Sequence, residues 1–459
     1  MKTIIYQIGR IDSGMFSKLS FVVEGKSIRT DLSSFAIKEY LSDKDVPVEV
    51  VLLYPVSLPF QPFLLQSERF KAQCDRECLE ALKRANENPA DHLENPEEFF
   101  KLHPHTKTAH DFLVLHSFGT YNTLKGLVSL QGHYADIVLK IVLFMIKRYL
   151  SDPAVERYII DISSGHNIYV SALINAVRHF CIWLKLYRWG QTSPLIETAI
   201  AEPVIPGVET DHRIYFEKLD AKAMLASPLS RDDVWDYRLS RIIYSFKNDR
   251  KKKGRLHDIL LSFATVFSAI KNNVPLIIYH DGYHGEAEVN KVLRQLVADM
   301  ERLLYEGYKG SPGLDRAAYI KTLLALGFYS GLIRILKEKG IHKSSEQGAE
   351  LQRIRKTFGE IYSIFHLRLN DTILGNEVDK LSKDINGTTK WTPLIKCLRN
   401  GSTLMTSPQK RNFFAHAGFE KNVTECKVVN EDGKEGIYLR YSTHHLDMIN
   451  NWILEALDE

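Results

Sequence analysis

The first half of the chain, up to residue 218, alternates short apolar runs with longer amphipathic stretches. The apolar runs have strand length and are rich in β-branched or aromatic residues; they cover residues 2–9, 48–55, 111–118, 157–163 and 213–219. Helical periodicity lies between several of them, at 74–86 and 136–150. Strands separated by crossover helices indicate a parallel, Rossmann-like α/β sheet. Such a sheet binds ligands at the carboxyl ends of its strands.

The second half has longer segments with apolar positions at helical spacing. The predicted helices cover residues 231–247, 255–271, 287–307, 316–338 and 348–369. Residues 425–442 form two β-prone arms around a polar, Gly-containing turn and predict a small β-hairpin. Because a proline and serines interrupt the periodicity at 222–233, we expect an α/β domain at 1–221, a linker at 222–233 and an all-α helical domain at 234–459.

The composition narrows the class of protein only slightly. A chain of 459 residues with 44% hydrophobic and 25% charged residues predicts a soluble protein of more than one domain. The net charge of +4 is too small for a histone-like nucleic-acid binder, although it permits a local basic channel. The basic stretch at 247–255 is either a solvated loop or a rim that guides RNA.

The cysteines and the apolar segments indicate a cytoplasmic protein. Five scattered cysteines argue against a secreted disulfide framework and for a reducing compartment. Cys74 and Cys78 lie one helical turn apart, but without a second pair at metal-ligand spacing we expect no metal site. The N-terminus has too short an apolar run for a signal peptide. The best apolar helix, 136–150, is too short to span a bilayer, so no membrane partner is expected.

Three polar, glycine-bearing turns follow predicted strands and are candidates for ligand binding. The most informative turn, between a strand and an amphipathic helix, contains Ser163, Ser164, Gly165, His166 and Asn167. A small-residue turn at a helix N-terminus brings free backbone N–H groups and the positive end of the helix dipole to a ligand. Neither GxGxxG nor GxxxxGK[ST] occurs on this turn, which argues against an NAD or ATP site.

The second turn follows the first strand and contains Gly9, Arg10, Asp12 and Ser13. The third, at 116–121, follows the central strand. Each turn alone could be an ordinary connection of an α/β fold. If the three turns surround one crevice, as strand ends of a parallel sheet do, together they favour a nucleotide-like ligand.

An arginine and a histidine that could cut RNA lie near the end of the chain, in "RNFFAHAGF" at 411–419. A histidine can take the 2′-OH proton, and an arginine can stabilise the more negative phosphorane that forms, without a metal. The Arg-x4-His spacing is weak support, because chance alone supplies such a pair about once in this chain and two are present, Arg411 with His416 and Arg440 with His445. The same spacing would occur if the arginine were an ordinary surface residue and the histidine were hydrogen-bonded to a nearby carbonyl group.

The context of the two pairs favours the first. Ser407 is a plausible helix N-cap, Pro408 a first helical residue and Gly418 a C-cap, so this pair is predicted on a short helix. At about 100° per residue, Asn412 shares a face with His416, whereas Arg411 diverges from it by about 140°. One copy cannot easily hold one phosphate with both groups, so a two-fold dimer is expected to combine two helices in one cleft.

The domain order and these motifs resemble the CRISPR-associated ribonucleases of type III systems, in which a CARF domain precedes a HEPN domain. "RNFFAHAGF" is similar to the family's Arg-Asn-x-x-x-His, so the resemblance implies that Arg411, Asn412 and His416 are the nuclease residues. "DISSGHN" is similar to the family's ligand loop. The resemblance implies a cyclic oligoadenylate activator, with the tetra-adenylate as the expected ring, and metal-independent cleavage of single-stranded RNA.

The resemblance also implies a homodimer as the functional unit, and leaves open a higher oligomer such as a hexamer. No cofactor is expected besides the allosteric activator. The sequence leaves two other hypotheses for the function. One is a non-catalytic, nucleotide-sensing regulator that binds nucleic acid, and the other is a toxin-like ribonuclease whose α/β half serves only assembly.

Overall fold

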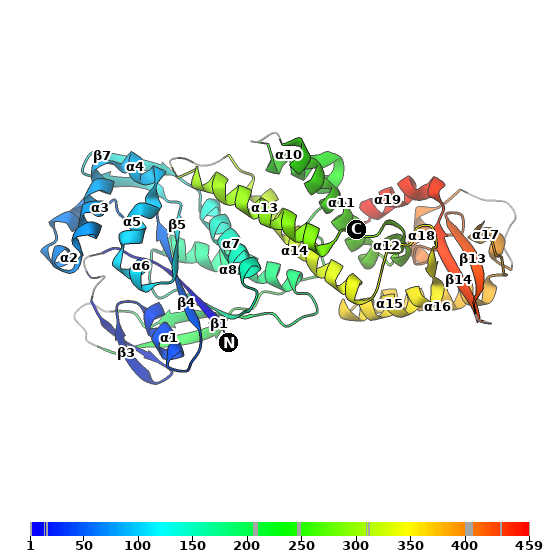
Figure 1. Ribbon diagram of the computed structural model, residues 1–459, viewed down its shortest axis with the longest axis horizontal. Coiled ribbons are helices and arrows are strands. Elements are labelled where there is room, and N and C mark those ends of the chain that lie inside the picture. Colours follow the sequence, from blue (N-terminus) through cyan, green and yellow to red (C-terminus); the bar gives the residue numbers. More distant parts are fainter. Residues whose placement is uncertain are drawn as a thin grey trace. The chain divides into compact units, whose positions relative to one another are not determined.

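The computed structural model describes residues 2–458 except 13, 15–16, 205–209, 246–248, 309, 311–312, 400–406 and 432–433. The chain forms two compact units (Figure 1). Unit 1 comprises residues 1–185, 192–222 and 294–316, and unit 2 comprises 186–191, 223–293 and 317–459. Residues 294–316, although they follow the linker in the sequence, therefore group with the N-terminal unit.

Unit 1 is built on an eight-stranded sheet with the order β3-β2-β10-β9-β8-β1-β4-β5. The strands are β1 (Lys2–Ile8), β2 (Leu19–Val23), β3 (Lys26–Thr30), β4 (Val48–Pro55), β5 (Asp111–Leu115), β8 (Val155–Asp161), β9 (Leu195–Ala201) and β10 (His212–Lys218). Strands β9, β8, β1, β4 and β5 are mutually parallel, which confirms the Rossmann-like α/β prediction. The prediction was wrong for β10, which pairs antiparallel with β9.

Helices and a hairpin complete unit 1. They are α1 (Ser33–Ser42), η1 (Pro62–Gln66), α2 (Glu68–Gln73), α3 (Arg76–Glu87), α4 (Pro89–Glu94), α5 (Pro96–Leu102), α6 (Pro104–Thr108), α7 (Tyr134–Ser151) and α8 (Asn167–Tyr187), with the hairpin β6 (Phe118–Thr123) and β7 (Gly126–Gln131). The strands β1 and β4 are buried along almost their whole length. Burial of each large apolar side chain contributes about 1.5–3 kcal/mol. This rigid sheet holds the turns at its strand ends in fixed positions.

Unit 2 is predominantly helical, as predicted. Its helices are α9 (Arg231–Val234), η2 (Trp235–Tyr237), α10 (Arg238–Ile243), α11 (Arg250–Lys271), α12 (Pro275–Asp281), α13 (Glu286–Tyr305), α14 (Arg316–Glu338), α15 (Leu351–Ile364), α16 (Arg368–Asp384), α17 (Leu394–Cys397), α18 (Lys410–Ala415), η3 (Thr443–His445) and α19 (Leu446–Glu455). The C-terminal parts of α13 and the start of α14 group with unit 1. The prediction for α14 matches its bounds.

Two helical predictions in unit 2 were wrong. The segment 231–247 is not one helix, because Asp236 and Tyr237 have φ angles of 53° and 64° and break it into α9, η2 and α10. A non-glycine residue in this region costs about 1–3 kcal/mol. The segment 348–369 ends as a helix at Ile364, and a separate helix, α16, starts at Arg368. His366 between them has a φ of 58°.

The predicted hairpin at 425–442 is confirmed as β13 (Thr424–Glu431) and β14 (Lys434–Tyr441). It forms a four-stranded sheet with β11 (Ala349–Glu350) and β12 (Thr392–Pro393), in the order β11-β14-β13-β12. A disulfide joins Cys397 to Cys426, which the expectation of a reducing compartment does not predict. Cys74, Cys78 and Cys181 are free and buried.

Helix α14 is the one helix among the described residues that is long and apolar enough to cross a membrane. Of its most apolar window, 78% is buried inside the protein, which is typical of a core helix. The segment 136–150, expected from the sequence to be the most apolar helix, is a different one. That segment lies in α7, where Lys140 is buried.

Candidate functional site

A cavity of about 810 Å³ lies at the carboxyl ends of the parallel strands β1, β4 and β8 in unit 1. Seven of the predicted ligand residues line it: Gly9, Arg10, Asp12, Ser163, Ser164, Gly165 and His166. Phe118 and Tyr121 of the third predicted turn also line it. The structure thus brings the three turns together around one cavity.

Two predicted residues fall outside this group. Asn167, the first residue of α8, lines a different cavity of about 450 Å³ together with Tyr134 and Arg178. Ser13 lies outside the described residues. Spacing along the turn could not separate Asn167 from Ser164, because the chain changes direction at Gly165, where φ is 110°.

Two glycines at the cavity are required by close packing. A Cβ atom on Gly9 would lie 2.2 Å from Cε1 of Tyr54, a fully buried ring. A Cβ atom on Gly165 would lie 2.7 Å from Cβ of Ile8, and its positive φ already disfavours a side chain. At both positions the neighbouring side chains lie so close that only a glycine fits without a shift.

A buried polar network fixes the Ser163–Ser164 turn. Gln7 is fully buried, and its Nε2 donates to Oγ of Ser33 at 3.0 Å and to Oγ of Ser164 at 2.9 Å. Oγ of Ser33 donates to Asp161 at 2.6 Å, and the backbone N–H of Ser163 donates to the same carboxylate at 2.9 Å. Burial raises the pKa of Asp161, while these donors oppose the rise.

The same network gives each serine of the turn a partner inside the protein. Oγ of Ser163 accepts from the backbone N–H of Ala201 at 2.8 Å, so both serine hydroxyls are used inside the protein. Gln7 and Ser33 were missed because they lie on an apolar strand and a distant helix, and no local motif marks them. We infer that the serines shape the turn, while Arg10 remains available to a ligand.

Arg10 supplies a cation at the cavity. Its Nη2 donates to the carbonyl oxygen of Asp31 at 3.5 Å, and its Nε lies 3.7 Å from Oδ2 of Asp12. The Asp12 carboxylate also accepts from the backbone N–H of Gly14 at 2.7 Å. The guanidinium is therefore held at the cavity by long contacts, and a phosphate could replace them with shorter, bidentate ones.

Hydroxyl groups line the opposite part of the cavity. Oγ of Ser117 accepts from the hydroxyl of Tyr169 and from Oγ of Ser57, each at 2.9 Å. Tyr169 and Ser57 line the cavity with the ring of Tyr121. Such groups suit a ligand that carries aromatic bases and hydroxyls as well as phosphates.

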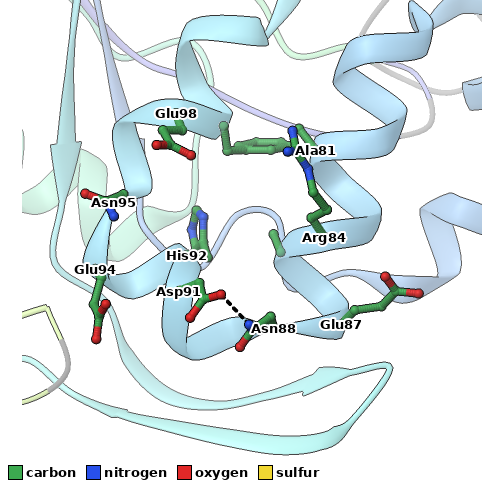
Figure 2. A pocket seen from close by; sticks show the side chains of 11 residues that line it. Ala81, Arg84, Glu87, Asn88, Asp91, His92, Glu94, Asn95 and Glu98 are labelled. Atoms are coloured by element: carbon green, nitrogen blue, oxygen red, sulfur yellow. Dashed lines mark hydrogen bonds between the residues drawn. The ribbon is translucent and has the colours of Figure 1, made fainter.

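A second cavity of unit 1, about 430 Å³, differs in charge (Figure 2). It lies on the helices α3 to α5 and is lined by Glu87, Asp91, Glu94 and Glu98, with Arg84 as the basic residue. Figure 2 shows the hydrogen bond that the Asn88 side chain donates to the Asp91 carboxylate in this cavity. An excess of carboxylates repels phosphate, so the cavity at the strand ends is the better candidate for an anionic ligand.

In unit 2, the Arg-Asn-x-x-x-His motif lies on the short helix α18. The predicted caps were wrong: Gln409 is the N-cap residue, and His416 itself occupies the C-cap position. Gly418 closes the turn, with its N–H donating to the carbonyl oxygen of Phe413 at 2.8 Å and a φ of 78°.

Aromatic packing anchors α18. Phe413 is fully buried, with its ring centroid 5.4 Å from that of Trp452 and 6.0 Å from that of Tyr441. The hydroxyl of Tyr441 donates to the carbonyl oxygen of Gly418 at 3.0 Å. Phe413 is thus a packing residue, and the hairpin strand β14 is part of what holds the helix.

The helix presents Arg411 and His416 to solvent in different ways. Arg411 is exposed and forms no ion pair or hydrogen bond with any other residue that the structure describes. The His416 side chain is 41% exposed, and its Nδ1 lies 3.1 Å from Oε1 of Glu377 on α16. Nδ2 of Asn412 donates to Oε1 of Gln409 at 3.1 Å. The described contacts do not join Arg411 to His416.

Glu377 is a functional candidate that the sequence analysis missed. It is mostly buried, with 17% of its side chain exposed, and Nδ1 of His416 is buried against it without a hydrogen bond to the described residues. A carboxylate beside one ring nitrogen stabilises a protonated imidazole and orients the other nitrogen. Glu377 lies on a separate helix, α16, so the spacing of the Arg-Asn-x-x-x-His motif does not point to it.

The second pair, Arg440 and His445, is used structurally. Nε of Arg440 donates to Glu425 across the hairpin at 2.8 Å, and its guanidinium lies 4.3 Å from the centre of the Trp391 ring. His445 is the last residue of η3. A cation held in this way is not free to bind phosphate, which favours the first pair.

Comparison with known proteins now places both sites in one family. A family model described as the CARF domain of the CRISPR system endoribonuclease Csx1 matches residues 3–203, which contain the turns that line the larger cavity. A model of the HEPN domain of the same family matches residues 367–443, which contain α18 and Glu377.

A curated relative, the CRISPR system endoribonuclease Csx1 of Methanocaldococcus jannaschii, is 34% identical over 104 residues. This alignment covers 19% of the chain and 22% of the relative. The fold is that of a CARF sensor domain followed by a HEPN domain. The two family models together span more than half of the chain, and it belongs to the Csx1 family of CARF–HEPN CRISPR proteins.

Proposed function

We propose that this protein is an endoribonuclease of type III CRISPR defence that a cyclic oligoadenylate activates. One observation carries the proposal: a single chain joins a nucleotide-sized cavity at the strand ends of a CARF domain to a HEPN helix that presents a free arginine and a histidine. The relative from Methanocaldococcus jannaschii bears the name of an endoribonuclease. The site of action is the cytoplasm.

In the proposed reaction, His416 removes the proton from the 2′-OH of a single-stranded RNA. The oxygen then attacks the adjacent phosphorus, the bond to the 5′-oxygen breaks, and a proton goes to that leaving oxygen. Arg411 stabilises the additional negative charge of the phosphorane, and Glu377 stabilises the protonated His416. The step leaves a 2′,3′-cyclic phosphate and a 5′-hydroxyl, and needs no metal.

The active site is completed by a second copy of the chain. Arg411 and His416 diverge on α18, so one helix does not hold one phosphate between them. A two-fold axis that apposes two α18 helices would provide two arginines and two histidines in one cleft. Asn412 shares the face of His416 and would lie in the same cleft. A higher oligomer such as a hexamer is compatible with this unit.

The cavity of unit 1 would bind the activator, for which we propose cyclic tetra-adenylate. Its phosphates would meet Arg10 and the N-terminal end of α8, which follows the Gly165 turn. A ring with two-fold symmetry can offer equivalent phosphates to two copies of the same helix. Binding would favour the active arrangement only if the ring binds that arrangement more tightly.

The test is incubation with a labelled single-stranded RNA in EDTA, with and without cyclic tetra-adenylate. Cleavage that requires the ring and tolerates EDTA is the expected result. Cleavage without the ring would identify a nuclease whose CARF domain does not regulate it. Absence of cleavage under both conditions would favour the non-catalytic regulator.

A further inference from the structure

Unit 2 exposes two aromatic rings at a break between helices. Trp235 is 46% exposed and Tyr237 is 41% exposed. Asp236 and Tyr237 both adopt left-handed backbone angles, a conformation that costs free energy for residues with side chains. We call residues 235–237 the aromatic elbow. The guanidinium of Arg231 lies 4.9 Å from the centre of the Trp235 ring, and both rings still leave a large part of their surface exposed.

The first turns of α11 carry a basic stripe beside the elbow. Arg250, Lys253, Gly254 and His257 share one helical face at i, i+3, i+4 and i+7. The ring of Tyr237 stacks on His257, with centroids 3.7 Å apart and an interplanar angle of 22°. The stretch 250–255 is therefore part of a helix and not the solvated loop that the sequence analysis considered.

The cations of this stripe are available to a ligand. Arg250 and Lys253 form no ion pair with residues in the described ranges. A Cβ atom on Gly254 would meet nothing within 4 Å, so close packing inside the protein does not require a glycine there. Gly254 lies beside Lys253 on this face and adds no side chain that would cover the cations.

The same face of α11 continues into a cavity of about 630 Å³. Leu261, Ser262 and Thr265 line one wall, and Asn450 and Asn451 of α19 line another. Oδ1 of Asn450 is buried without a hydrogen bond to any described residue. The remaining polar lining includes Asp258, Asp281 and Asp447. Carboxylates and amide oxygens accept hydrogen bonds from base edges, and the carboxylates repel phosphates, so this cavity suits a nucleobase.

Helix α19 connects the cavity to the candidate nuclease helix. Trp452 packs against Phe413 of α18, and Glu455 lies 3.3 Å from Nζ of Lys410. One helix, α19, therefore contacts α18 and lines the cavity. Along α11, the stripe starts at Arg250, the elbow contacts the helix at His257, and the lining of the cavity starts at Asp258.

We propose that the aromatic elbow, the basic stripe and this cavity form a binding track for single-stranded RNA that leads to α18. Unpaired bases stack on exposed rings, while cations bind the phosphates regardless of sequence. Double-stranded RNA cannot place its stacked bases on the rings or in the cavity. The proposal rests on the proposed nuclease function and names the path of its substrate.

The experiment measures RNA affinity by fluorescence anisotropy in EDTA, with the full chain carrying His416→Ala so that the RNA stays intact. In this background, the stripe variant combines Arg250→Ala with Lys253→Ala. The matched control combines Lys337→Ala with Lys356→Ala, which removes the same charge from exposed positions of α14 and α15. Each anisotropy series is repeated over a range of salt concentrations. Thermal unfolding of each variant checks its fold.

We expect the stripe variant to bind RNA on the order of tenfold more weakly than the parent at 0.1 M salt. The slope of log affinity against log salt concentration should become smaller in magnitude by about 1.4, which is about 0.7 for each of two lost phosphate contacts. The control should retain the parent's affinity and slope. Tyr237→Ala should weaken binding about tenfold without changing the slope, because stacking carries no counterion release. Double-stranded RNA should compete poorly.

Two results would overturn the track, and they differ in what they say of the nuclease. If the wild-type chain cuts RNA and the His416→Ala chain binds it, but the stripe variant matches the control, the RNA follows another path and the proposed function stands. If neither chain binds or cuts RNA with the activator present, the proposed function fails as well.

Discussion

Replacement of Gly9 by alanine tests the close packing that shapes the candidate ligand cavity. The added Cβ would lie 2.2 Å from Cε1 of Tyr54, where carbon atoms normally keep about 3.5–4.0 Å. The Tyr54 ring cannot move freely, because it stacks on Phe100 with centroids 4.8 Å apart and its hydroxyl accepts from Thr106 at 3.0 Å. Either the strand end or a fully buried ring must shift.

The magnitude follows from two opposing effects. Overpacking of a buried site costs about 1–3 kcal/mol. The φ angle of Gly9 is not in the left-handed region, so alanine regains about 0.4–1 kcal/mol through the unfolded chain. We expect a net loss of about 1–2 kcal/mol, which lowers the Tm of a unit of this size by about 2–8 °C.

The assay is thermal unfolding of the full chain, with Gly254→Ala as a matched control. Gly254 lies inside α11 with open space around its Cα, so alanine should raise the free energy of unfolding by about 0.5–1 kcal/mol. Gly9→Ala should also raise the concentration of cyclic tetra-adenylate needed for half-maximal cleavage. A Tm of Gly9→Ala equal to that of wild type would refute the packing argument.

Three further outcomes are expected. His416→Ala should abolish RNA cleavage without changing activator affinity, whereas His445→Ala should cut normally; the reverse pattern in a gel assay would show that the wrong pair was chosen. Glu377→Gln should lower kcat about 10–100-fold with little change in KM, and an unchanged kcat would remove Glu377 from the site. Burial lowers the pKa of Lys140 to about 7. The unfolded chain therefore binds more protons between pH 7 and 10.5, and the free energy of unfolding should rise with pH in that range. Urea unfolding at both ends of this pH range should show that the free energy of unfolding rises less with pH in Lys140→Met than in the wild type. An equal rise in both proteins would show that Lys140 is not the group responsible.

The sequence predicted the elements whose pattern is strong and local. Strand β4 and helix α14 have the predicted bounds, because a continuous apolar run and a long helical period leave few alternatives. Strands β2 and β3 were missed, since each has only five residues, of which two are buried in β2 and one in β3. The break at Asp236 and Tyr237 was missed because neither residue is a glycine or a proline.

Part of the candidate sites was also readable from residue order. The turns at Gly9 and Gly165 were recognised because small residues follow apolar strands, and the topology of a parallel sheet brings such turns to one edge. The nuclease motif was found by its residue types, and its rival was set aside by context. The caps of α18 were predicted wrongly, since the helix is held by tertiary contacts of Phe413 and not by a local capping side chain.

The sequence by itself determined the class of each half, the position of the candidate ligand turns and the Arg-Asn-x-x-x-His motif, because periodicity and turn chemistry are local properties of the chain. Only the tertiary structure decided what surrounds these residues. It placed Gln7 and Ser33 behind the sensor turn, Glu377 beside His416, and the stripe of α11 in line with a cavity. These partners come from elements far apart in the chain, and packing alone brings them within contact distance.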